Sequence, residues 1–131
     1  MPLALPALMT LIAVLWYVIT AIYVGRAHIK YKIDAPAMAG HPALERAVRV
    51  QMNTLEQLAA FLPAMWIYAW FGNPRWAAIA CALWIVGRIV YAVGYWVDAN
   101  KRGPGFIITF LALAFVWVGA VWSVVRVLDF A

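Results

Sequence analysis

The chain has 131 residues, of which 68% are hydrophobic and 11% are charged, and its mean hydropathy is +0.89. Because a soluble domain carries about 25% charged residues, this composition excludes a water-soluble globule. Ten Lys and Arg against five Asp and Glu give a net charge of +5, which we interpret as a signature of membrane topology and not of a nucleic-acid partner.

Four apolar segments each approach the roughly 20 residues needed to cross a bilayer: residues 1–25, 57–74, 76–97 and 103–125. They predict an all-α membrane protein, a bundle of four transmembrane helices forming one domain over residues 1–131. Prolines and turn residues mark the boundaries. The expected helices run from Pro6 to about His28, from Pro42 to about Trp70, from Pro74 to about Asp98, and from the end of a break at 101–105 onward.

Basic residues gather at two of the three connections. The first is flanked by Arg26, Lys30, Lys32, Arg46 and Arg49, and the third contains Lys101 and Arg102. The second connection has only Arg75, and the C-terminal end only Arg126. The positive-inside rule therefore predicts that connections one and three are cytoplasmic and that both termini lie outside. The first segment has no basic region before its apolar run, so we expect a retained helix and not a signal peptide.

The second predicted helix carries polar residues that a membrane helix retains mainly for function. At 100° per residue, Arg49, Asn53 and Glu56 share one face within roughly 60°. Gln51 lies about 200° from Arg49, so we expect it to contact a neighbouring subunit. The alternative for Arg49 and Glu56 is a structural ion pair that holds the bundle together.

The third predicted helix has a matching face, since Arg88, Tyr91 and Tyr95 are spaced i, i+3 and i+7. If the two faces meet, they form a cationic pocket rich in hydrogen-bond donors near the cytoplasmic end, suited to an anionic, peptide-like ligand. The alternative for the tyrosines is anchoring at the membrane interface. Spacings for a metal site, a Ser-His-Asp triad or a phosphate loop are missing from the sequence.

The pattern Glu-Arg-x-x-Arg-x-Gln-x-Asn-x-x-Glu at 45–56, followed by Gly-Arg-x-x-Tyr-x-x-Gly-Tyr at 87–95, resembles the MAPEG superfamily of membrane-associated proteins in eicosanoid and glutathione metabolism. The residues that follow, up to Phe106, look like the bacterial branch nearest microsomal glutathione transferases and leukotriene synthase. The resemblance implies a homotrimer that binds glutathione between subunits. With the charge distribution above, we expect it in a bacterial inner membrane with periplasmic termini.

Carried over by position, the resemblance implies that glutathione is held by Arg49, Asn53, Glu56, Arg88, Tyr91 and Tyr95, with Gln51 reaching the site of the next subunit. Arg102 falls where that branch has the arginine that stabilises the thiolate. Gln57 departs from the pattern, because the branch usually has tyrosine directly after the glutamate. The implied activity is that of a glutathione transferase, with glutathione peroxidase chemistry in addition.

Activation of the thiol requires only modest stabilisation. Lowering a thiol pKa from about 8.5 to about 6.5 needs roughly 2.7 kcal/mol, and one charge-assisted hydrogen bond supplies about 1.5 to 3 kcal/mol. Arg102 alone suffices, without a metal. The thiolate attacks a hydrophobic electrophile or reduces a lipid hydroperoxide, in an apolar acceptor site formed by residues such as Ile107, Phe110 and Trp117. The alternatives are a non-catalytic scaffold or regulator of the same family, and a small four-helix drug transporter.

Overall fold

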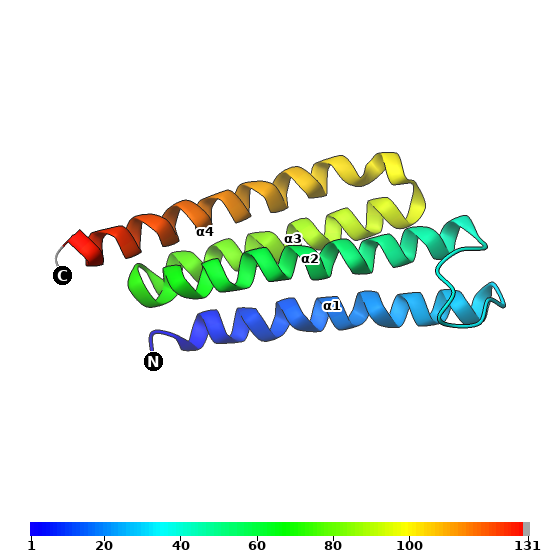
Figure 1. The fold of residues 1–131 in the computed structure, drawn as a ribbon, viewed down its shortest axis with the longest axis horizontal. Coiled ribbons are helices and arrows are strands. Elements are labelled where there is room, and N and C mark those ends of the chain that lie inside the picture. The colour runs from blue at the N-terminus through cyan, green and yellow to red at the C-terminus, as the bar shows by residue number, and fades with distance from the viewer. Residues whose placement is uncertain (130–131) are drawn as a thin grey trace.

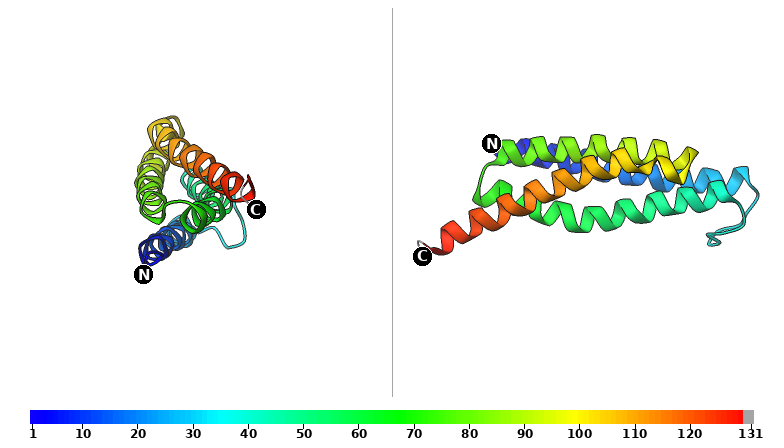
Figure 2. Two further views of the ribbon diagram at one scale, coloured as in Figure 1. Left: turned by 90° about the vertical axis from the view of Figure 1, so that its left-hand side faces the viewer. Right: turned by 90° about the horizontal axis from the view of Figure 1, so that it is seen from above.

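The computed structural model describes residues 1–129, which form four long helices lying side by side (Figure 1). The helices are α1 (Ala4–Lys30), α2 (Pro42–Phe71), α3 (Pro74–Val97) and α4 (Gly103–Asp129), and a short 3-10 helix, η1 (Ala99–Arg102), joins the last two. The α1–α2 loop and η1 lie at one end of the bundle. The N-terminus, the last turns of α4 and the α2–α3 turn lie at the other end, as the views in Figure 2 also show.

Local capping explains where α2 and α3 begin. Each has proline in its first turn, where the missing N–H is not needed. The side chain of His41 accepts a hydrogen bond from the backbone N–H of Ala43, and the side chain of Asn73 accepts from Arg75 and Trp76. The predicted starts of these two helices, at Pro42 and Pro74, are therefore confirmed.

The predicted break before the fourth helix is misplaced. The irregular segment comes earlier, as η1, where the carboxylate of Asp98 accepts a hydrogen bond from the backbone N–H of Asn100. The α-helix then begins at Gly103. Pro104 and Gly105 thus lie inside its first turn, because a proline there costs no backbone hydrogen bond. α1 is also a few residues longer at each end than predicted.

Three of the four helices have both the length and the hydropathy to cross a membrane: α1, α3 and the segment formed by η1 with α4. The protein is an integral membrane protein. α2 does not meet the same criteria, so its crossing of the membrane stays a prediction. At 30 residues this helix is long enough, but its first half carries Glu45, Arg46, Arg49 and Glu56. Ionisable residues in a membrane helix are energetically costly, so each is expected to have a polar partner or a functional role.

Of the three helices that qualify as membrane spans, α3 is the most buried, and it lies against α1, α2 and α4. Trp84 is fully buried and stacks on Phe61 of α2, with ring centroids 5.2 Å apart. Gly87 faces Thr109 and Ile108 of α4 with no room for a side chain, so α3 and α4 approach each other closely. This close contact lies just below the end of the bundle that carries η1.

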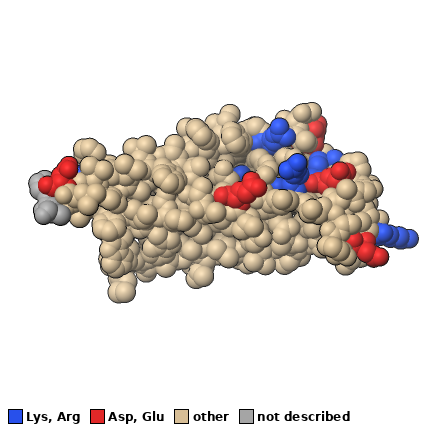
Figure 3. Space-filling view, in the orientation of Figure 1, with Lys and Arg blue, Asp and Glu red and all other residues tan. Residues whose placement is uncertain are grey.

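Charge is distributed unevenly along the bundle. Figure 3 shows that Lys and Arg side chains gather toward the end that carries the α1–α2 loop and η1, while the rest of the visible face is almost uncharged. Among residues 1–129, the only Lys or Arg side chains at the opposite end are Arg75 and Arg126. The two ends therefore differ in charge as the positive-inside argument requires.

Candidate functional site

A cavity of about 360 Å³ opens between α2, α3 and the α3–α4 connection. Its lining residues are Asn53, Glu56, Gln57, Arg88, Tyr91, Arg102 and Phe106. Five of these seven residues were predicted from the sequence as site residues, four as glutathione contacts and Arg102 as the catalytic residue. The polar faces of the second and third predicted helices therefore meet, and η1 brings Arg102 to the same place from outside both helices.

Arg88 is the most deeply buried of the charged residues, with 1% of its surface exposed. Its Nη2 donates a hydrogen bond to the hydroxyl of Thr54 at 3.3 Å. Its guanidinium carbon lies 4.0 Å from the ring centroid of Tyr91, a cation–π contact. Its Nε is buried and has no hydrogen-bond partner. Every partner of this buried cation is thus neutral, and one of its donors is unused.

The tyrosines connect Arg88 to Arg102. Tyr91 accepts a hydrogen bond from the Asn53 amide at 2.7 Å, which fixes its phenol. The rings of Tyr91 and Tyr95 lie 5.5 Å apart between centroids, and the guanidinium of Arg102 lies 5.7 Å from the centroid of Tyr95. Both phenols are buried. The result is a continuous array in which two guanidiniums flank two aromatic rings.

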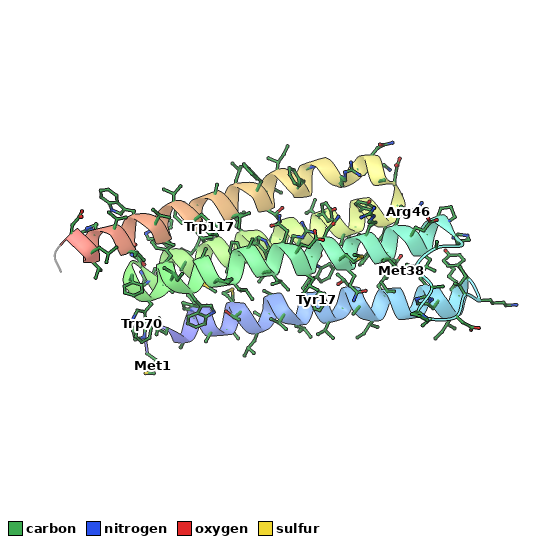
Figure 4. All side chains as sticks on the ribbon, in the orientation of Figure 1. Met1, Tyr17, Met38, Arg46, Trp70 and Trp117 are labelled. Atoms are coloured by element: carbon green, nitrogen blue, oxygen red, sulfur yellow. The ribbon has the colours of Figure 1, made fainter. Side chains whose placement is uncertain are left out.

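The end of α3 is held against α2 beside this array. Nε of Arg46 donates a hydrogen bond to the backbone carbonyl of Trp96 at 3.0 Å, and Figure 4 labels Arg46 at this end of the bundle. The contact joins the beginning of α2 to the last turn of α3, next to Tyr95. It therefore positions the turn from which η1 and Arg102 begin.

Three predicted contacts lie outside the cavity lining. Tyr95 packs beside Tyr91 but does not line the cavity. Arg49 is exposed on α2, one turn before Asn53. Gln51 lies on the opposite face of α2, where its amide donates to the hydroxyl of Tyr17 on α1 at 3.4 Å. Tyr17 is labelled in Figure 4. The amide thus has a partner in its own chain, because α1 covers this face of α2. Contact between Gln51 and a neighbouring subunit stays a prediction.

Several residues of the site were not predicted as contacts. Gln57 lines the cavity and accepts a hydrogen bond from the indole of the buried Trp84 at 3.3 Å. Its spacing of four residues from Asn53 could have placed it on the same face. Helix spacing could not identify Thr54 or Trp84, because each contributes through a hydrogen bond to the other helix. Thr54 on α2 accepts from Arg88 on α3, and Trp84 on α3 donates to Gln57 on α2.

A larger cavity, of about 750 Å³, lies at the opposite end of the bundle, between the α2–α3 turn and the last turns of α4. Arg126 is the one charged residue in its lining, and the cavity contains none of the predicted residues. We therefore assign the candidate site to the smaller cavity, where charged and hydrogen-bonding side chains converge. Its volume falls within the range of about 300 to 1,000 Å³ typical of small-molecule sites.

The charges of the smaller cavity define a ligand chemistry. Two guanidiniums, from Arg88 and Arg102, face one carboxylate, from Glu56. This set complements a ligand with two anionic groups and one cationic group. In the described part of the chain, no three His, Cys, Asp or Glu residues gather in a way that could hold a metal ion.

Comparison with known proteins identifies a family and several relatives. A model of the MAPEG family matches residues 6–122. An uncharacterised protein of Synechocystis sp. is 47% identical over 119 residues, which cover 91% of this chain and 87% of that protein. Human microsomal glutathione S-transferase 2 is 37% identical over 72% of this chain and 64% of its own length. Bovine leukotriene C4 synthase is 30% identical over 76% of this chain and 66% of its own length.

Proposed function

The chain belongs to the MAPEG family, and from this premise we propose that it is a membrane-embedded glutathione transferase with accompanying glutathione peroxidase activity. Relatives in the family include a glutathione S-transferase and a leukotriene synthase. The family makes a glutathione-using membrane enzyme the natural starting point. The substrate and the residues that act on it are argued below from the cavity.

The observation that carries the proposal is the unsatisfied buried cation. Arg88 is 1% exposed, its partners are neutral and its Nε is unpaired. A buried charge without a counter-charge is costly, so a ligand carboxylate at this point would be strongly favoured. Glutathione in its thiolate form brings one carboxylate and the thiolate to the two guanidiniums of the lining and its ammonium group to Glu56. Its second carboxylate is left for a cation outside the lining.

We assign the roles by position. Arg88 holds a carboxylate of glutathione, and Glu56 faces its ammonium group. Asn53 and Tyr91, already joined by a 2.7 Å hydrogen bond, form a fixed wall. Arg102 is exposed at the mouth of the cavity, where its guanidinium can donate a hydrogen bond to the thiolate. Arg49, one turn before Asn53 on α2, attracts the second carboxylate from outside.

The thiol loses its proton to solvent, and the thiolate sulfur attacks an electrophilic carbon. The new S–C bond forms as the bond to the leaving group breaks, and the leaving group keeps the electron pair. With a hydroperoxide, the sulfur attacks the terminal oxygen and the O–O bond breaks to give an alcohol. The resulting sulfenic acid then reacts with a second glutathione, which yields the disulfide and water.

The second substrate is hydrophobic. Phe106 lines the cavity and stacks on Phe110, with centroids 6.2 Å apart, and both side chains are about half exposed. Ile107 beside them is also exposed. This apolar strip on α4 leads from the lipid-facing surface to the cavity. Trp117 lies farther along α4, where its indole donates to the backbone carbonyl of Ala60.

The proposal includes an assembly and an orientation. We expect a homotrimer in a bacterial inner membrane, with α2 as a fourth membrane-crossing helix whose polar face is turned to the ligand site. The end with η1 and the α1–α2 loop is then cytoplasmic, so the cavity receives glutathione from the cytoplasm. Both termini are periplasmic.

The proposal is tested by the ultraviolet absorbance of the glutathione thiolate, titrated into the purified protein in detergent at neutral pH. The wild-type protein should produce a saturable thiolate signal. In Arg102→Ala, loss of the charge-assisted hydrogen bond should raise the activation free energy of the thiolate-dependent step by about 1.5 to 3 kcal/mol. The rate should therefore fall roughly tenfold to more than a hundredfold, while glutathione affinity changes little.

Arg126→Ala serves as the matched control, because it removes one exposed arginine from the opposite end of the bundle. It should keep both the signal and the turnover. Full thiolate absorbance and full turnover in Arg102→Ala would disprove the role of that residue. A wild-type protein that binds glutathione without any thiolate signal would disprove the proposed enzyme and favour a non-catalytic family member.

A further inference from the structure

A second polar cavity, of about 400 Å³, lies at the corner between the end of α1 and the start of α2. Its lining consists of Tyr23, Arg26, Ala27, Lys30, Tyr31 and Ala43. None of these residues lines the candidate glutathione site, and the proposed enzyme mechanism uses none of them. We infer that this cavity binds the phosphate of an anionic glycerophospholipid.

The charge of the lining selects for an anion. Arg26 and Lys30 are four residues apart on α1, and Tyr23 precedes Arg26 by three, so the three side chains share one face. None of the six lining residues is Asp or Glu. A guanidinium, an ammonium group and two phenols together offer the donors that a phosphate diester accepts, and basic pockets between membrane helices are typical sites of anionic headgroups.

The aromatic walls of the cavity are held in place by their neighbours. The ring of Tyr23 stacks on Trp96 of α3 with centroids 3.9 Å apart. The ring of Tyr31 stacks on His41 at 3.8 Å, and Nζ of Lys30 lies 5.4 Å from its centroid. Two elements that are distant in sequence therefore fix the two phenols, so the cavity does not have to form when the ligand arrives.

The position of the cavity along α1 matches the headgroup region. Residues 1–25 contain no charged side chain, and Arg26 is the first. A helix rises about 1.5 Å per residue, so some 20 residues before Arg26 cover the roughly 30 Å of hydrocarbon. Arg26 and Lys30 thus fall at the level where lipid phosphates lie, at the cation-rich end of the bundle (Figure 3).

An apolar surface continues from the cations toward the bilayer centre, which favours a lipid over a soluble phosphate. Leu15, Ile19 and Ile22 are 56%, 41% and 57% exposed. Ile19 follows Leu15 by four residues, and Ile22 follows Ile19 by three. Arg26 comes four residues after Ile22, so these side chains form one stripe on α1 that ends at the guanidinium of Arg26. A bound phosphodiester can lay an acyl chain along this stripe.

The test is native mass spectrometry of the protein in mild detergent, with phosphatidylglycerol and phosphatidylcholine of identical acyl chains added in equal amounts. The measured quantity is the ratio of the two lipids bound. The wild-type protein should favour phosphatidylglycerol. In the double variant Arg26→Gln/Lys30→Gln the ratio should fall by roughly tenfold or more, because each cation near the membrane surface contributes roughly a fivefold preference.

The control variant Arg75→Gln/Arg126→Gln removes two cations from the other end and should keep the ratio within about twofold of wild type. The swap Arg26→Lys/Lys30→Arg keeps both charges and should retain the preference even if the Gln variant does not fold. Equal losses in both Gln variants, or no preference in the wild-type protein, would overturn the inference. Displacement of the lipid by glycerol phosphate would show a site for soluble phosphate instead.

Discussion

Gly105 gives the sharpest test of how the packing of α3 and α4 supports the site. It lies in the first turn of α4, directly against the backbone of α3. A Cβ atom at this position would overlap the backbone nitrogen and Cα of Tyr91 and the carbonyl oxygen of Gly87. Backbone atoms cannot swing aside as a flexible side chain can. Gly105→Ala must therefore move α4 away from α3.

The same chain contains a matched control two residues earlier. A Cβ atom at Gly103 would meet no atom within 4 Å, and Gly103 is also helical. Replacing glycine by alanine in a helix contributes about 0.5 to 1 kcal/mol of stability, whereas overpacking costs about 1 to 3 kcal/mol. Gly103→Ala should be neutral or slightly stabilising. Gly105→Ala should be less stable than Gly103→Ala by about 1 to 3 kcal/mol, the cost of the overlap.

The displacement should also reach the cavity. Phe106 directly follows Gly105, and Arg102 precedes it by three residues. Tyr91, in contrast, is held on α3 by its hydrogen bond to Asn53. Moving α4 outward therefore separates Arg102 from the tyrosines. Thermal unfolding of both variants in one detergent measures the stability, and the glutathione thiolate signal measures the site. If Gly105→Ala matches Gly103→Ala in both readouts, the close approach of the two helices does not hold the site together.

Three further outcomes are expected. Arg49→Ala should weaken glutathione binding by about tenfold, measured by equilibrium binding, because the second carboxylate of the ligand then loses its cation while Glu56 still pairs with the ammonium group. Unchanged affinity would show that Arg49 is not part of the site. Native mass spectrometry in mild detergent should show trimers, and only monomers or dimers would contradict the shared site. A cysteine at Ala37 should resist an impermeant thiol reagent applied to intact cells, whereas one at Asn73 should react; the reverse pattern would invert the topology.

Sequence reasoning succeeded where a rule acts locally. Proline in a first turn marks the starts of α2 and α3, and the structure begins both helices there. The same residue type misled the prediction before α4. There the turn is made by η1 and the carboxylate of Asp98, so Pro104 follows the helix start and does not precede it.

The candidate site divides in the same way. The spacing of Arg88, Tyr91 and Tyr95 on one helix was enough to place them on one face. Thr54 was not predicted, because its hydroxyl matters only as the acceptor of a hydrogen bond from Arg88 on another helix. Gln51 shows the converse. Its direction on α2 was predicted, but its partner depends on the face that α1 covers, and this is a property of the whole bundle.

The polar face of α2 and the buried arginine of α3 have one explanation. Arg88 in an apolar helix is expensive, and the structure does not neutralise it with a carboxylate within hydrogen-bond reach but surrounds it with Thr54 and the ring of Tyr91. A bundle built for stability alone would place an apolar residue here, because replacing a buried ion costs little or is favourable. In the proposed function, the cost of burying this charge beside a cavity, with Nε unpaired, is offset when an anion binds. The same proposal accounts for the lower apolarity of α2, since its polar residues Asn53, Glu56 and Gln57 line the cavity that the anion would enter.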